Sequence, residues 1–205
     1  LSQFYFDISK DTLYTQGTDA PERRAVQTVL YEVLHSLVRL VAPILPHTAE
    51  EVWKHAPGTD VISVQLTDMP TGQRVSLTQE TVERWHKFLE LRDVVLKALE
   101  DARKEKVIGT SLAAAVDLYP DEATYELLRK FQNLDKLFIV SQVTLHPPGS
   151  PVRAHQTVPL LVAVKQAEGE KCERCWIVTP EVGTHPTHPT LCHRCADAVE
   201  KYYVM

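Results

Sequence analysis

The segment PERRAVQTVLYEVLHSLVRLV, residues 21–41, places apolar side chains every three or four residues. This spacing aligns them along one side of an α-helix, so the segment predicts a helix with one buried face. Pro21 suits the first turn, where no backbone N–H is needed, and Pro43 ends the helix because its ring breaks the hydrogen-bond ladder. The side chains expected on the buried face are Val26, Val29, Leu30, Val33, Leu34, Leu37, Val38 and Val41.

Helical patterns continue on both sides of this segment. The aromatic-rich start, residues 1–10, resembles the end of a truncated helix, and a shorter helix carrying Trp53 is expected after Pro46. Residues 57–76 hold proline, glycine, threonine and aspartate around a short apolar patch, which is typical of a connection. A second long helix is expected over residues 78–106, with one apolar face.

The other face of the helix over residues 78–106 is rich in basic residues. Solvation and pairing with acidic neighbours are the ordinary explanation for such a face. Arg92 differs because it falls inside the apolar stripe, where it either extends its charged end to solvent or is held for a partner; we favour the first. The basic residues are Arg84, Lys87, Arg92, Lys97, Arg103, Lys104 and Lys106.

The pattern changes after Gly109. Residues 112–118 are short and rich in alanine and valine, 121–131 are helical in pattern, and 137–145 and 158–164 are β-branched segments typical of strands. A cluster of proline, glycine and serine at 147–151 separates the last two.

The expected fold class is therefore mainly α, in three parts. Residues 1–110 form a helical bundle truncated at its N-terminus, 111–165 form a small α/β segment, and 166–205 form a cysteine module resembling a zinc ribbon.

Composition excludes several classes of protein. With 205 residues, 24% charged and 44% hydrophobic, the chain is typical of a soluble globular protein. It has no apolar run long enough for a membrane span and no secretory signal pattern. A net charge of −5 argues against nucleic-acid binding by a bulk positive field, although a local contact surface remains possible. Leu1 in place of an initiating methionine suggests a piece of a longer protein.

The four cysteines form two C-x2-C pairs: Cys172 with Cys175, and Cys192 with Cys195. This arrangement predicts one tetrahedral zinc ion, Zn²⁺, in a reducing compartment. Four thiolates close the coordination shell, so the metal is expected to be structural and not catalytic. Two disulfides or a four-thiolate iron site are the alternatives, and the nearby histidines (His185, His188 and His193) are expected to be loop residues.

Two residues beside the first cysteine pair are candidates for binding. Trp176 either packs over the metal module or offers its ring for stacking on an unpaired base. Arg174 lies between two ligands, so its backbone is fixed; its side chain is expected to point away from the ion, towards a phosphate or a base edge.

The segments KCERCW (171–176) and LCHRC (191–195) resemble the C-terminal zinc finger of bacterial isoleucyl-tRNA synthetases, a finger type shared with formamidopyrimidine-DNA glycosylases. Further segments resemble the anticodon-binding bundle of the same synthetases and the stretch that leads to the finger. They are LSQFYFDISKDTLYT (1–15), RRAVQTVLYEVL (23–34), VAPILPHTAEEVW (41–53), ALEDARKEKVIGTSLAAAV (98–116) and LFIVSQV (137–143).

This resemblance implies the tRNA-recognition part of a ligase that attaches isoleucine to tRNA-Ile in the cytoplasm. The ATP-binding patterns of the family's catalytic domain do not occur in the sequence, so the fragment alone is not expected to be an enzyme. The implied partners are tRNA-Ile and the catalytic and editing domains of the parent chain, with no membrane and a monomeric state. The residues expected to contact tRNA are Arg174, Trp176, Arg92, Arg103, Lys104 and Lys106.

Two other functions remain open from the sequence. The zinc module can be a structural staple that does not touch RNA, or the chain can be the tail of a glycosylase-type nucleic-acid-binding protein. The glycosylase reading is weakened by the upstream residues, which resemble synthetase helices.

Overall fold

The computed structural model describes residues 2–72, 76–150 and 158–203. The chain divides into two compact units. One is Thr18–Ser76, and the other combines Leu1–Gly17 with Leu77–Met205. Within the described residues, no helix combines the length and apolar character needed to cross a bilayer.

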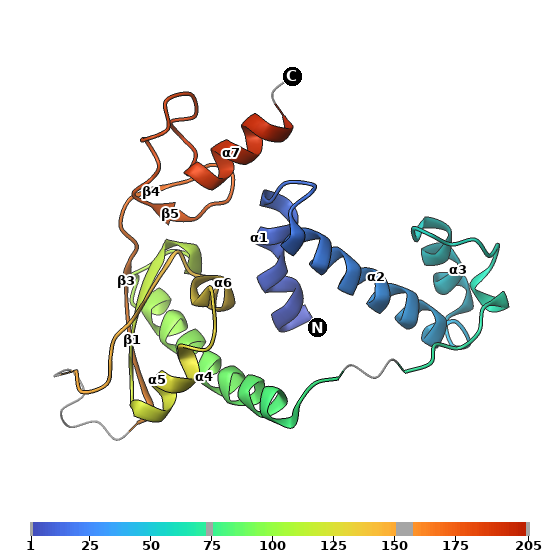
Figure 1. The fold of residues 1–205 in the computed structure, drawn as a ribbon, viewed down its shortest axis with the longest axis horizontal. Helices are drawn as coiled ribbons and strands as arrows, with labels where there is room; N and C mark the ends of the chain where they lie inside the picture. Colours follow the sequence, from blue (N-terminus) through green and yellow to red (C-terminus); the bar gives the residue numbers. More distant parts are fainter. Residues whose placement is uncertain (1, 73–75, 151–157, 204–205) are drawn as a thin grey trace. The chain divides into compact units, whose positions relative to one another are not determined.

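The unit Thr18–Ser76 is a helical hairpin. Helix α2 (Pro21–Val41) is followed by α3 (Pro46–His55), which folds back beside the end of α2, and by the 3₁₀ turn η2 (Val64–Leu66) (Figure 1). Trp53 of α3 is buried in the small core, and its indole N–H donates to the carbonyl of Val61 at 2.9 Å.

The predicted buried face of α2 is only partly correct. Val38 is buried, but Val29 and Leu37 are exposed. The short α3 packs against the C-terminal part of α2 and leaves the rest of the stripe without cover inside this unit.

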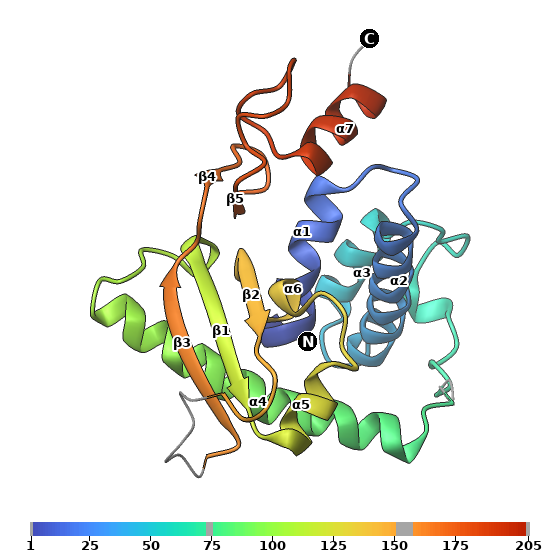
Figure 2. The same cartoon turned by 60° about the vertical axis from the view of Figure 1, so that its left-hand side comes forward.

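The second unit is built around a three-stranded sheet with the order β2-β1-β3. Strand β1 pairs in parallel with β2 and antiparallel with β3, in register from Ala114↔Gln166 to Pro120↔Leu160. Helix α4 runs along the sheet, and α5 and α6 connect β1 to β2 (Figure 2). The elements are η1 (Ser2–Phe6), α1 (Asp7–Thr15), α4 (Gln79–Lys104), η3 (Ser111–Ala113), β1 (Ala114–Pro120), α5 (Glu122–Leu128), α6 (Leu134–Phe138), β2 (Gln142–Leu145) and β3 (Leu160–Gln166).

Helix α4 shares its core with this sheet. Phe88 and Leu99 of α4 are fully buried together with Leu118 of β1 and Phe138 of α6. The ring of Phe88 lies 4.4 Å from that of Phe131 and 5.6 Å from that of Phe138. The sequence placed α4 with the bundle over residues 1–110, whereas the structure packs it with the α/β segment because its apolar stripe faces the sheet.

The expected strand over residues 137–145 begins later than predicted. Its first residues belong to α6, which ends where Ile139 adopts a left-handed backbone with φ of 59°, and β2 starts at Gln142. The predicted helix over 121–131 is confirmed in its first part by α5. The breaker cluster at 147–151 extends to Pro151, which lies outside the described residues.

The C-terminal module contains a short hairpin and a helix. Strands β4 (Glu170–Lys171) and β5 (Val178–Thr179) pair antiparallel, and α7 (His193–Tyr202) follows the second cysteine pair. Gly169 precedes the hairpin with φ of +105°, and a Cβ at this position would lie 2.2 Å from the carbonyl carbon of Thr179. Only glycine fits this position without backbone movement.

Candidate metal centre and the surface beside it

Four buried cysteines meet in the C-terminal module. Cys172 and Cys175 lie in the loop after β4, Cys192 caps α7, and Cys195 lies in its first turn. Their sulfur atoms all lie within 4.8 Å of one another. A tetrahedron with Zn–S bonds of about 2.3 Å has edges of about 3.8 Å, and the Cys175 and Cys192 sulfurs are 3.8 Å apart. The four residues therefore fit a structural zinc site with a closed shell.

Local hydrogen bonds shape both cysteine loops. The Trp176 N–H donates to the Cys172 carbonyl at 2.9 Å, and the Cys195 N–H donates to the Cys192 carbonyl at 3.0 Å. The Cys192 N–H points at the Cys172 sulfur at 3.4 Å. Hydrogen bonds from Cys192 and Cys195 hold the pKa of the Cys175 thiol well below its ordinary value. These contacts favour the thiolate, the form that binds metal, at Cys175, whereas the hydrogen bond between Cys175 and Cys192 raises the pKa of the Cys192 thiol.

The nearby histidines contact residues of the loop before α7 and of α7 itself. His193 and the Thr184 hydroxyl are 2.7 Å apart, and His185 accepts a hydrogen bond from the His188 N–H at 3.3 Å. Among the described residues the cluster that could hold a metal contains cysteines only, as predicted.

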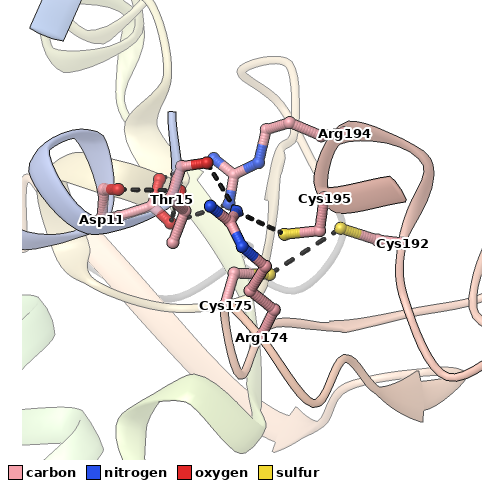
Figure 3. Close-up of polar contacts among 7 residues, drawn as sticks. All are labelled: Asp11, Thr15, Arg174, Cys175, Cys192, Arg194 and Cys195. Carbon is pink, nitrogen blue, oxygen red and sulfur yellow. Dashed lines mark hydrogen bonds and ion pairs between the residues drawn. The ribbon is translucent and has the colours of Figure 1, made fainter. Parts of the chain in front are cut away.

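Arg194 ties the second cysteine pair to helix α1. Its Nη1 and Nη2 bind the two carboxylate oxygens of Asp11 at 2.6 and 2.7 Å (Figure 3). Burial alone would lower the pKa of this guanidinium, but the hydrogen bonds and charge of Asp11 raise it above its ordinary value. No local pattern in the sequence predicts this pair, because the two residues are far apart in the chain.

Arg174 also turns towards α1. Its Nη1 donates to the Thr15 carbonyl at 2.5 Å and lies 3.6 Å from the Cys195 sulfur. The prediction that this side chain points away from the ion is wrong, because a cluster of thiolates and a helix C-terminus both attract a guanidinium. A guanidinium has five N–H donors, and these contacts use Nη1.

Trp176 lies at the rim of the first cysteine loop with 60% of its surface exposed. Its backbone is left-handed, with φ of 66°, and the Lys171 ammonium lies 5.2 Å from the ring centroid. A bulky residue rarely adopts this conformation, so the cysteine loop imposes it. The exposed ring favours the stacking interpretation over packing on the metal module.

A cavity of about 480 Å³ lies beside this ring. Trp176 and Arg174 line it from the cysteine loop, while Tyr14 and Lys10 line it from α1. Tyr14 is 77% exposed, and no motif in the sequence marks it as a functional residue. The rest of the lining combines apolar side chains with polar and charged residues. The apolar ones are Ile8, Leu112, Ile139, Val140 and Ile177, and the others are Asp7, Asp11, Thr15, Asp135, Lys136 and Cys175.

The other predicted basic residues lie outside the cavity lining. Arg103, Lys104 and Lys106 are exposed at the end of α4, where Lys104 pairs with Glu100 at 2.8 Å. Arg92 is only 6% exposed, and its Nε donates to the Leu137 carbonyl at 2.9 Å. The expectation that Arg92 reaches solvent is wrong, because a backbone carbonyl inside the fold satisfies it.

The comparisons with known proteins agree with this architecture. Residues 1–118 match the family described as the anticodon-binding domain of tRNA ligase, and residues 169–198 match the zinc finger found in FPG and IleRS. The chain belongs to the anticodon-binding domain family of tRNA ligases.

Its curated relatives include isoleucine–tRNA ligases of several bacteria. The chain is 53% identical over 206 residues to that of Halalkalibacterium halodurans, and 54% identical over 205 residues to that of Shouchella clausii. These matches cover 100% and 99% of this chain and 22% of each relative. The chain thus spans about a fifth of the length of these relatives.

Proposed function

We propose that this chain recognises the anticodon region of tRNA-Ile as the C-terminal part of an isoleucine–tRNA ligase. The observation that carries the proposal is the exposed Trp176 ring, set beside a cavity on a rigid cysteine loop. Family membership over residues 1–118 and the relatives' similarity along the whole chain support the same function.

The physical basis is base stacking. Sequence-specific RNA recognition favours unpaired loop bases, which can stack on aromatic side chains. An anticodon loop offers such bases, and Trp176 offers a ring held by its backbone. Arg174 lies beside it, with donors besides Nη1 that can reach a phosphate or a base edge.

Basic residues at the end of α4 supply a second contact surface. Arg103, Lys104 and Lys106 are exposed and close in sequence, which suits phosphate binding. Because the chain carries a net charge of −5, this attraction acts locally and not through the overall field. Arg92 is excluded from this surface by its burial.

The catalytic step belongs to other parts of the parent protein. In this proposal the chain positions tRNA-Ile in the cytoplasm, a catalytic domain joins isoleucine to it, and an editing domain removes errors. The parent acts as a monomer, and the isolated chain activates no amino acid.

A second candidate function is a structural staple. One observation favours it: Arg174 and Arg194 of the cysteine loops both bind α1, so the metal module is attached to that helix. The glycosylase interpretation has less support, because residues 1–118 match the tRNA ligase family.

A tRNA-binding experiment distinguishes the proposed recognition function from the structural-staple alternative. The intact chain is titrated with a tRNA-Ile transcript and with a transcript that carries a changed anticodon, and a matched pair of variants is compared. Trp176→Ala should weaken binding of the tRNA-Ile transcript, whereas Ile62→Ala, which truncates a 90% exposed side chain in the other unit, should not. Equal binding of both transcripts, with no effect of Trp176→Ala, would favour the staple.

A further inference from the structure

The two cysteine loops carry an arginine at the same position, directly before the second cysteine of each pair. Both guanidinium groups contact the same helix, α1, and the Arg174 guanidinium also stays within 3.6 Å of the Cys195 sulfur (Figure 3). Arg194 binds Asp11, and Arg174 binds the carbonyl of Thr15, one helical turn further on. We call these four residues the α1 clamp.

The charged groups of Arg194 and Asp11 in the clamp are hydrogen-bonded to each other and partly buried. The side chains of Arg194 and Asp11 are 33% and 24% exposed, and their two hydrogen bonds are parallel. The Thr15 hydroxyl donates to the Asp11 carbonyl at 2.7 Å and to its carboxylate at 3.1 Å. Such bidentate, partly buried pairs fix orientation better than single exposed ion pairs do.

A third contact adjoins the clamp. The ring of Tyr202 in α7 covers Gly17, just beyond α1, so closely that a Cβ on Gly17 would lie 2.1 Å from it. The end of α1 is therefore held by the module at several points along its length.

The clamp joins the two walls of the cavity. Trp176 follows Arg174 by two residues, while Tyr14 precedes Thr15 on α1, and both aromatic residues line the same cavity. The separation of these walls depends on how the cysteine module sits on α1. The module's own fold depends on its four thiolates, so weakening the clamp can change this separation without unfolding the module.

We propose that Asp11 is a positioning residue for RNA recognition: through Arg194 it holds the metal module on α1, so that Trp176 and Tyr14 face one cavity that accepts an unstacked base. This inference rests on the proposed function. In this inference Arg174 and Arg194 both attach the metal module to α1. The residue that orients the module, Asp11, is more than 150 residues away from the cysteine loops in the sequence.

The test uses the intact chain and four variants. Asp11→Asn keeps the side-chain shape but removes the charge, and Asp11→Glu restores the charge. Glu126→Gln is the matched control, because it breaks an exposed ion pair with Arg129 in the same unit. Trp176→Ala is made alone and together with Asp11→Asn.

Three quantities are measured: the affinity for the tRNA-Ile transcript, the zinc content, and amide hydrogen exchange over residues 7–15 and 170–178. We expect Asp11→Asn to weaken tRNA binding roughly 5- to 20-fold, which is less than the loss of a whole charge-assisted pair because the Asn amide oxygen can still accept a hydrogen bond from Arg194. Exchange should rise in both segments while one zinc per chain is retained. Asp11→Glu should recover part of the affinity, and Glu126→Gln should stay within about twofold of the original.

The variant that combines Asp11→Asn with Trp176→Ala shows whether Asp11 affects tRNA binding by positioning Trp176 or in an unrelated way. If Asp11 acts through Trp176, Asp11→Asn should cost little further affinity once Trp176 is absent. Three outcomes would overturn the inference and leave the proposed function standing. They are additive losses of affinity in the double variant, loss of zinc in Asp11→Asn, and unchanged tRNA binding in Asp11→Asn while Trp176→Ala binds weakly. Unchanged binding in Trp176→Ala would overturn both.

Discussion

Replacement of one metal ligand should unfold the C-terminal module, loosen α1, and leave the core between α4 and the sheet intact. The apolar side chains packed around the cysteines are few and only partly buried: Ile177, Val182 and Leu191. At about 1.5–3 kcal/mol for a fully buried side chain, they contribute no more than several kcal/mol. Structural zinc contributes about 10–16 kcal/mol in zinc-finger peptides. The metal term is therefore the larger, and Cys192→Ala should remove most of the module's stability.

Hydrogen exchange followed by mass spectrometry measures this effect segment by segment. In Cys192→Ala, amides over residues 170–203 should exchange rapidly, and α1 should lose protection because Arg174 and Arg194 no longer hold it. Amides of α4 and β1 should keep their protection, since their core around Phe88 is separate. Zinc content should fall to near zero. Retained protection over 170–203 in a zinc-free variant would show that apolar packing, and not the metal, holds the module together.

Three further predictions concern stability. Phe88→Ala empties a fully buried site between aromatic rings and should lower the free energy of unfolding by about 3–5 kcal/mol in urea melts; a loss below about 1 kcal/mol would contradict the core assignment. Gly169→Ala places a Cβ against the facing strand at positive φ and should weaken zinc retention against a chelator, whereas unchanged retention would show that the hairpin adapts. Burial would raise the pKa of Asp117, but Lys165 and His146 lower it below its ordinary value; its stabilising effect should be full above about pH 5 and be lost as the pH falls below about 4. Urea melts of Asp117→Asn should thus show a stability deficit at pH 7 that shrinks at pH 3, and a constant deficit would argue against the ion pairs.

Local patterns in the sequence predicted much of this fold. The spacing of the cysteines predicted the metal centre because a metal shell requires only those residue types at short intervals. The apolar periodicity of α2 and α4 predicted both helices, since one buried face repeats with the helical turn. The beginning of β2 was missed because the left-handed Ile139, which ends α6, leaves no local sign in the sequence.

Long-range polar contacts account for the remaining differences. Asp11 and Arg194 are paired only by the folded backbone, and so are Arg92 and the Leu137 carbonyl. No spacing rule connects such residues, because each pairing depends on how distant elements pack. The side-chain direction of Arg174 was mispredicted for the same reason: its partner Thr15 lies at the other end of the chain.

We propose above that the exposed Trp176 ring on the cysteine loop contacts the tRNA. This contact is tested most directly in a full-length isoleucine–tRNA ligase that carries this chain, by measuring kcat/KM for tRNA-Ile in aminoacylation with Trp176 and with Trp176→Ala. Base–aromatic stacking is worth about 1–3 kcal/mol, so we expect kcat/KM to fall roughly 5- to 100-fold. Isoleucine-dependent ATP–pyrophosphate exchange, which needs no tRNA, should be unchanged and zinc should remain bound. An unchanged kcat/KM in the zinc-bound Trp176→Ala enzyme would show that this ring does not take part in tRNA recognition.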